Sequence, residues 1–200
     1  AESYVAPSPY AFGVAMDRYD KEGFRQPPAG VKYPLRGVLR PAIEIHSNEH
    51  ATLNDHGINV IKSKRDRGVL ILGARTRTAN VFFNTITDRV IFNVILATLR
   101  DAYDDLIFES IDGQGQLFGV IERTGYSILY RFWLAGILFG ATPQESFKLQ
   151  CNRGNNPDLD LEGGVVRLDV YAIPSPFTEK LIANVNRVAI GEMQYVGFVN

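Results

Sequence analysis

The sequence predicts an α+β domain of layered α/β type, in which a mixed β-sheet packs with two long helices and both chain ends extend as arms. Two long stretches have the apolar periodicity of helices, and several short apolar stretches are bounded by glycines and charged turns. With 200 residues, of which 46% are apolar, the chain is long enough to bury one core.

Residues 1–42 are expected to form an extended, proline-rich lead-in or arm. A proline inside a helix removes a hydrogen bond and clashes with the preceding turn, so the composition argues against a long helix here. The prolines are Pro7, Pro9, Pro27, Pro28, Pro34 and Pro41. We expect a core domain over residues 43–190, which begins with a short helix that Ser47 caps and that continues to Asn54.

A β-hairpin is predicted next, with strands over residues 59–63 and 69–74. Gly57 ends the preceding polar stretch, and the sequence Asp66-Arg67-Gly68 provides the turn. Glycine adopts a positive φ at such positions without steric cost, which is what a tight hairpin requires.

Two long helices follow the hairpin. Over residues 85–108, apolar side chains recur three and four positions apart and cover more than half of the helix circumference, so we expect this helix to be largely buried. The sequence Gly113-Gln114-Gly115 then breaks the chain. A second helix is expected from Leu117 to Ala135, with Gly136 as its C-terminal stop.

The remainder of the chain is predicted to be β-structure, with strands over residues 147–152, 165–171 and 181–190. The last ten residues, 191–200, favour strands but have no obvious partner in the sequence. Such a segment suits strand addition to a neighbouring sheet, and we predict that it is a C-terminal arm. The residues expected to donate this strand are Met193, Gln194, Tyr195, Val196, Phe198 and Val199.

Several short segments follow one another in a recognisable order. Residues 53–76 read LNDHGINVIKSKRDRGVLILGART, preceded by PYAFGV at residues 9–14, and GILFGA at residues 136–141 leads to PQESF at residues 143–147. In order and spacing they resemble the contractile tail sheath proteins of bacteriophages and related bacterial injection devices. Leu72 departs from that pattern, because many sheaths have Trp at this place, and the variable outer domains of larger sheaths have no counterpart in this sequence.

This resemblance implies a structural subunit without enzymatic activity or cofactor. Its expected partners are other sheath subunits, an inner tail tube protein and a baseplate, with no direct contact to nucleic acid or membrane. Copies would polymerise around the tube and contract by rearranging, driving the tube through a target envelope. The expected location is a virion tail assembled in the host bacterial cytoplasm, or a phage-tail-like particle.

Charge is distributed unevenly along the chain. Residues 1–100 have 14 Lys and Arg against 9 Asp and Glu, whereas residues 101–200 have 7 against 13. We predict that the unlike patches meet head to tail between copies, because such contacts build rings or open filaments. The predicted contact residues are Lys62, Lys64, Arg65, Arg67, Arg75, Asp101, Asp104 and Asp105. The alternatives are plain solvated surfaces and, for Arg75, an ion pair within its own chain.

No catalytic or metal site is predicted. The phosphate-binding loop of nucleotide hydrolases is absent. The clustered histidines have no nearby Cys to complete a zinc site and lack the HExxH order, and the spaced carboxylates lack the pattern of a calcium loop. The groups in question are His46, His50, His56, Asp158, Asp160 and Glu162. Cys151, the single cysteine, is expected to fill a place in the core.

Two alternatives to a sheath subunit remain open at this stage. One is an α/β enzyme or small-ligand-binding domain in which Arg75, Asp104 and the histidines lie near a pocket. The other is a tail-tube or baseplate protein, which two long helices fit less well. Tubular polymers seen by electron microscopy would favour the sheath over a monomeric, ligand-binding domain.

Overall fold

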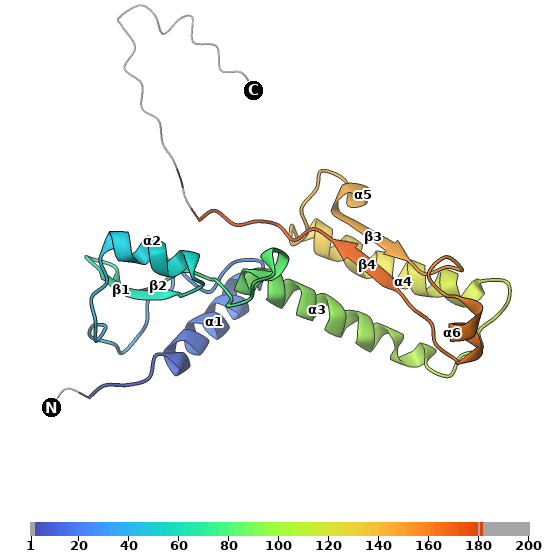
Figure 1. Cartoon of the computed structure of the whole chain (residues 1–200), viewed down its shortest axis with the longest axis horizontal. Helices are drawn as coiled ribbons and strands as arrows, with labels where there is room; N and C mark the ends of the chain where they lie inside the picture. The colour runs from blue at the N-terminus through green and yellow to red at the C-terminus, as the bar shows by residue number, and fades with distance from the viewer. Residues whose placement is uncertain (1–2, 180, 182–200) are drawn as a thin grey trace, which may run out of the picture.

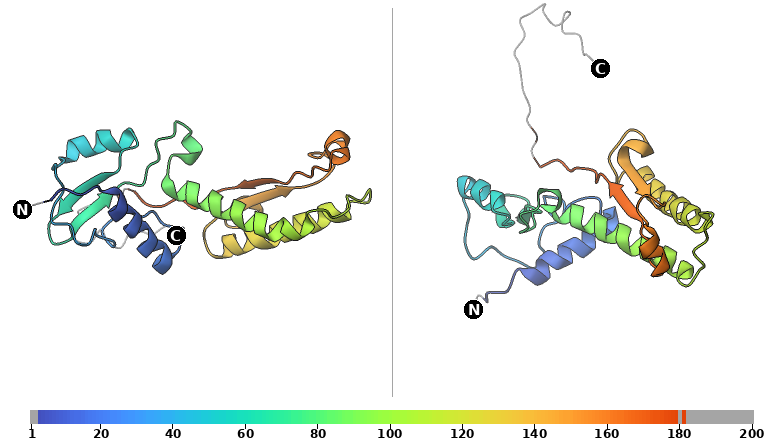
Figure 2. Two further views of the ribbon diagram at one scale, coloured as in Figure 1. Left: turned by 90° about the horizontal axis from the view of Figure 1, so that it is seen from below. Right: turned by 45° about the vertical axis from the view of Figure 1, so that its right-hand side comes forward.

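A computed structural model describes residues 3–179 and 181 of the chain. Figure 1 shows an elongated molecule with one β-hairpin and two helices at one end, and a long pair of antiparallel helices that runs to the other end. A second β-hairpin lies along this helix pair, as the two views of Figure 2 also show. The predicted α+β class is therefore confirmed.

The first helix, α1 (Ser8–Glu22), corrects the expectation that residues 1–42 are extended. Pro7 and Pro9 stand at its N-cap and in its first turn, where the missing N–H has no partner to lose and the fixed φ suits a helix. The next proline is Pro27, and the helix ends before it, at Gly23, where φ is 75°. The prolines flank this helix, so they do not break it.

The N-cap of helix α2 (Ser47–Asp55) is His46, one residue before the predicted Ser47. The His46 backbone N–H donates to a Glu49 carboxylate oxygen at 2.8 Å, which satisfies one orphan donor of the helix start. The predicted hairpin follows as strands β1 (Val60–Lys64) and β2 (Gly68–Leu72), paired antiparallel.

The hairpin is covered on one side by α1 and by the segment after it. Val14 of α1 packs with Val69 and Ile71 of β2, and with Leu35. The Leu35 N–H donates to the Val69 carbonyl at 2.8 Å, so this segment also covers the outer edge of β2. A two-stranded hairpin is marginal alone, and this cover is what gives it a core.

Helix α3 (Ile86–Tyr103) follows a short 3₁₀ turn, η1 (Val81–Phe83), and begins at Thr85, whose hydroxyl accepts from the Asp88 N–H at 3.1 Å. Its buried residues are Thr87, Ile91, Ile95 and Leu99. The prediction of a largely buried helix was too strong, because Leu96 on the other side is half exposed. A second turn, η2 (Asp104–Leu106), ends this helix short of residue 108.

Helix α4 (Gln116–Leu134) returns antiparallel to α3, close to its predicted bounds. The chain enters it through Gly115, with φ 79°, and leaves it through Gly136, with φ 68°. The two helices approach closely at Gly125, because a Cβ placed there would lie 2.6 Å from the Tyr103 hydroxyl oxygen. The main core lies between α3, α4 and the second hairpin.

The second hairpin consists of β3 (Phe147–Gln150), after the short helix α5 (Pro143–Ser146), and β4 (Asp169–Ala172). A further short helix, α6 (Asp158–Glu162), was not predicted. Within the described residues the strands form two separate antiparallel pairs, so the prediction of one mixed sheet was wrong. The strand expected over 165–171 is only partly buried and starts later. The strand predicted to end at residue 190 and the arm at 191–200 lie outside the described residues, save Leu181.

Candidate assembly interface

The most distinctive part of the sequence, residues 57–76, joins the two ends of the molecule. The Asn59 side chain donates to the Arg75 carbonyl at 2.9 Å and accepts from the Arg75 N–H at 2.7 Å. Gly57 has φ 73°, and a Cβ there would lie 2.7 Å from the Thr76 carbonyl oxygen. The close approach and the positive φ explain the glycine at residue 57, and the two hydrogen bonds to the Arg75 backbone explain the asparagine at residue 59.

The same segment is paired with the start of α3. The Ile86 N–H donates to the Ala74 carbonyl and the Thr76 N–H to the Asn84 carbonyl, both at 2.8 Å. Arg75 makes an ion pair with Glu179, at 2.6 Å between its guanidinium and the carboxylate. Of the two interpretations of Arg75, the structure therefore contains the contact within its own chain.

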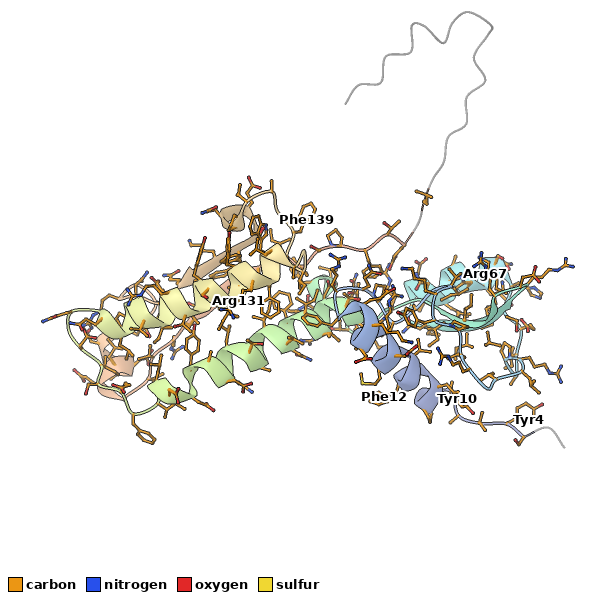
Figure 3. All side chains as sticks on the ribbon, turned by 180° about the vertical axis from the view of Figure 1, so that it is seen from behind. Tyr4, Tyr10, Phe12, Arg67, Arg131 and Phe139 are labelled. Carbon is orange, nitrogen blue, oxygen red and sulfur yellow. The ribbon has the colours of Figure 1, made fainter. Side chains whose placement is uncertain are left out.

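The other predicted charge residues lie at opposite ends of the molecule. Lys64, Arg65 and Arg67 are exposed at the turn of the β1–β2 hairpin, and Arg67 marks this end in Figure 3. Asp101, Asp104 and Asp105 are exposed where α3 ends, at the far end of the long helix pair. Across the described residues, no ion pair involves any of these six, or Lys62.

Strand β4 has an unpaired backbone edge. The Ile173 N–H donates to the Ser146 carbonyl at 2.9 Å, and the Ile173 carbonyl accepts from the Phe139 N–H at 2.8 Å. Because hydrogen-bonded pairs alternate along an antiparallel ladder, the N–H and C=O groups of Val170 and Ala172 point away from β3. No backbone group among the described residues bonds to that edge.

Exposed apolar side chains are numerous and often adjacent. The pair Val81 and Phe82 is mostly exposed, and so is the pair Ile107 and Phe108. Contiguous exposed apolar surface marks contact sites more often than scattered single residues do. Further exposed examples include Tyr4, Phe12, Leu39, Phe139, Leu159 and Tyr171; Figure 3 labels Tyr4, Phe12 and Phe139.

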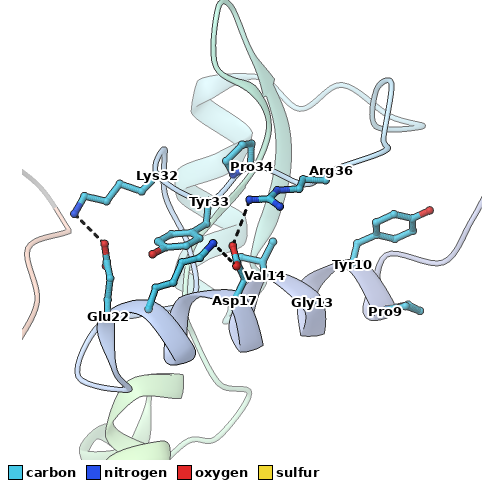
Figure 4. Close-up of a pocket in the computed structure, with 11 residues that line it drawn as sticks. Pro9, Tyr10, Gly13, Val14, Asp17, Glu22, Lys32, Tyr33, Pro34 and Arg36 are labelled. Atoms are coloured by element: carbon cyan, nitrogen blue, oxygen red, sulfur yellow. Dashed lines mark hydrogen bonds and ion pairs between the residues drawn. The ribbon is translucent and has the colours of Figure 1, made fainter.

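A groove of about 740 Å³ lies between α1 and the segment 32–36 (Figure 4). Its floor is apolar, with Tyr10, Val14 and Pro34. Charged groups stand on its rim, where Lys32 pairs with Glu22 at 3.1 Å. The other ion pairs on this rim join Asp17 to Lys21 and, at 3.7 Å, to Arg36.

The residues proposed for an enzyme or ligand-binding domain do not come together. His50 bonds through Nε2 to the Leu72 carbonyl at 3.1 Å, whereas Asp104 lies at the other end of the molecule. Neither the groove on α1 nor a smaller one beside Arg25 is lined by a histidine, Arg75 or Asp104. Over residues 3–179, no group of three His, Cys, Asp or Glu is placed to hold a metal ion.

Two further groups are structural. Cys151 is buried, and burial raises the pKa of its thiol to about 11, which leaves it protonated and unreactive at neutral pH. Asp112 accepts from the backbone N–H groups of Gln114, Gln116 and Leu117 and so closes the start of α4. None of the helices that the structure describes combines the length and apolarity needed to cross a bilayer.

Comparison with known proteins bears on the fold. No protein-family model and no curated protein matches the sequence, but solved structures do. A chain of the anti-feeding prophage (AFP) baseplate gives a TM-score of 0.83 at 24% identity, over 92% of this chain and 50% of that one. A chain of the PVC sheath complex, an extracellular contractile injection system in its contracted state, gives 0.84 at 21%, over 94% and 52%. The AFP helical sheath in its contracted state gives 0.80 at 24%, over 91% and 50%.

The chain therefore has the fold of subunits from contractile injection systems, and the resemblance seen in the sequence is confirmed at the level of the fold. It spans about half the length of the solved chains that it matches. Sequence reasoning missed the groove on α1 and the exposed Phe108. A helix between Pro9 and Pro27 could have indicated the first, whereas nothing in the local pattern around residue 108 indicates the second.

Proposed function

We propose that this chain is a structural subunit of a contractile sheath, without enzymatic activity, that polymerises around an inner tube and connects to a baseplate. The observation that carries the proposal is the unpaired outer edge of β4 in a fold shared with sheath chains. An open edge is normally a liability that soluble proteins cover. In a polymer it is where a strand from a neighbouring subunit adds.

The donated strand is the C-terminal arm, residues 191–200, with Met193, Gln194, Tyr195, Val196, Phe198 and Val199 as its strand residues. Backbone hydrogen bonds to Val170 and Ala172 of the acceptor supply affinity, and the exposed side chains of Tyr171 and Ile173 supply contacts on one face. Each subunit would thus be tied to a neighbour by chain segments and not only by surface contact.

Contraction in such an array needs no nucleotide. The extended array is held behind a barrier, and subunits rotate to new contacts while the strands keep them tethered. Particle and location follow from the same proposal, namely a phage tail or a phage-tail-like particle assembled in the bacterial cytoplasm. The charged ends contribute to register between copies through Lys62, Lys64, Arg65 and Arg67 on one side and Asp101, Asp104 and Asp105 on the other.

Electron microscopy of the full-length protein tests the proposal. The wild type should form tubes, and Ala172→Pro should abolish them without unfolding the hairpin, because only the outward N–H is lost. Ala172→Val keeps that N–H and should still form tubes. Tubes from the proline variant would refute the role of the β4 edge. A wild-type protein that stays monomeric, with its C-terminal segment intact, would refute the sheath function.

Charge reversal tests the part played by the charged ends. Changing Lys64, Arg65 and Arg67 to Glu should weaken polymer assembly and change its dependence on salt, because the basic patch then repels the acidic one. Sedimentation of the polymer fraction at low and high salt measures this. Unchanged assembly at both salt concentrations would show that the charged ends have no role in register.

A further inference from the structure

The tip of the long helix pair has an unusual backbone. Phe108 has φ 74°, one of only two described non-glycine residues with positive φ, and its ring is fully exposed. A bulky side chain is disfavoured in this conformation, and strain of this kind is kept where surrounding structure or function requires it. The neighbouring Ile107 is 60% exposed as well. The backbone thus presents two exposed apolar side chains to solvent at the end of the molecule.

These two side chains are flanked by carboxylates in the sequence. Between residues 101 and 112 there is no basic residue. The acidic ones are Asp101, Asp104, Asp105, Glu109 and Asp112. Asp112 closes the start of α4, and the other four are exposed without an ion-pair partner in the described part of the chain. A matching surface therefore needs an apolar hollow with basic groups around it.

The groove on α1 has this form. Tyr10, Val14 and Pro34 give it an apolar floor, and its volume of about 740 Å³ is ample for one aromatic side chain. Its rim has three cations, Lys21, Lys32 and Arg36, which pair with the two carboxylates Asp17 and Glu22 and leave one positive charge in excess. Gly13 leaves the middle of the groove open, because a Cβ there would have no atom within 4 Å.

The groove is continuous with the basic hairpin turn. The Leu35 N–H bonds to the Val69 carbonyl at 2.8 Å, and a Cβ on Gly68 would lie 3.6 Å from Pro34. Arg67 precedes Gly68 in the exposed turn, but it is not one of the residues that line the groove. Helix α1 and the β1–β2 hairpin lie toward one end of the molecule, and the end of α3, which Phe108 follows closely in the chain, lies at the other (Figure 1).

We propose that Phe108 of one copy inserts into the α1 groove of the next copy, with the surrounding carboxylates facing the basic rim. The contact joins two different surfaces, so repetition gives an open or ring-shaped array and not a closed twofold dimer. This inference rests on the proposed function, because it names a contact between subunits of the polymer. It is separate from strand addition at β4, which uses other residues.

Cross-linking between marked copies tests the contact. Full-length Phe108→Cys and Gly13→Cys chains are co-expressed, polymerised and oxidised, and the native Cys151 stays buried. We expect a disulfide dimer from the mixture and none from either variant alone. Phe82→Cys, at a position that is 78% exposed, replaces Phe108→Cys as the matched control and should give no dimer with Gly13→Cys. Polymers without the dimer between positions 108 and 13 would overturn this contact and leave the sheath proposal standing.

Two substitutions provide a second measurement. Phe108→Gly removes the ring and suits the positive φ, so the monomer should be at least as stable as wild type while the polymer fraction falls at least tenfold. Gly13→Trp should block the groove with the same loss, whereas Gly13→Ala, which leaves the groove open, should assemble normally. Wild-type assembly by both Phe108→Gly and Gly13→Trp would refute the insertion. A wild type that does not polymerise at all would refute the sheath proposal together with it.

Discussion

The close contact between α3 and α4 at Gly125 gives a quantitative prediction. In Gly125→Ala, helix propensity favours Ala by about 1 kcal/mol. The new Cβ, however, would lie 2.6 Å from the Tyr103 hydroxyl oxygen and 3.3 Å from a Leu149 methyl carbon. The hydroxyl cannot easily move, because it stands on a rigid ring and donates to the Ile121 carbonyl at 2.9 Å. Overpacking typically costs about 1–3 kcal/mol, so after the gain in helix propensity we expect a net loss of up to about 2 kcal/mol.

Removing the hydroxyl should reverse this result. Tyr103→Phe alone should cost about 0.5–1.5 kcal/mol for the lost hydrogen bond. In that background the closest contact of the new Cβ is with Leu149, so Gly125→Ala should be neutral or should stabilise by up to about 1 kcal/mol. The two substitutions are therefore expected to be coupled by about 1–3 kcal/mol, which is the overpacking cost that Tyr103→Phe removes.

The assay is urea unfolding of the unpolymerised protein, followed through the fluorescence of Trp133, the only tryptophan of the chain. Trp133 lies in α4, and its indole N–H donates to the Gly140 carbonyl at 3.0 Å, so it reports on this helix. All four members of the cycle are measured at one pH and salt concentration. Equal effects of Gly125→Ala in the wild-type and Tyr103→Phe backgrounds would refute the steric explanation.

Three other predictions concern single side chains. Arg18 is buried and donates to the Ala29 carbonyl and the Gln26 side chain, both at 2.6 Å. Arg18→Ala should therefore lower the free energy of unfolding by about 3 kcal/mol, whereas Arg36→Ala, at an exposed ion pair, should lower it by less than about 0.5 kcal/mol. Urea unfolding measures both. Backbone N–H groups hold the pKa of Asp112 below its usual value. Its stabilising effect is therefore present above about pH 3.9 and is lost as the pH falls through the lower pKa of the folded state. The acid unfolding curve of Asp112→Ala should lack this contribution. The Cys151 thiol, with its pKa raised to about 11, should resist iodoacetamide at about pH 8 until the chain unfolds. Mass spectrometry follows the labelling. Rapid labelling of the folded protein would contradict the burial of this thiol.

Local pattern was sufficient for the elements with strong periodicity or clear turns. The β1–β2 hairpin and α4 lie close to their predicted bounds, because the Asp66–Gly68 turn and Gly136 are local signals. The composition does not indicate α1, because proline breaks a helix in its interior but is compatible with its first turn and with the segment after its end. Burial of α3 was overestimated, since a wide apolar stripe does not say which part of it has a partner.

The candidate surfaces depended on tertiary structure. That the basic turn and the acidic residues lie at opposite ends follows from the direction of α3, which composition does not contain. The unpaired edge of β4 follows from hydrogen bonds of Ile173 to two separate segments. The positive φ of Phe108 has no signature in its neighbours, because the residue type argues against that conformation.

The hydrogen bonds between residues 57–76 and the start of α3 have a mechanical consequence. The Asn59 side chain makes two hydrogen bonds to the Arg75 backbone, and the neighbouring Ala74 carbonyl accepts from the Ile86 N–H at the start of α3. We expect a force applied to the basic turn to reach α3 through these hydrogen bonds, with little rotation of the hairpin relative to the helix. We expect the subunit to act as a lever about as long as its helix pair, so that a small rotation at one end gives a large displacement at the other.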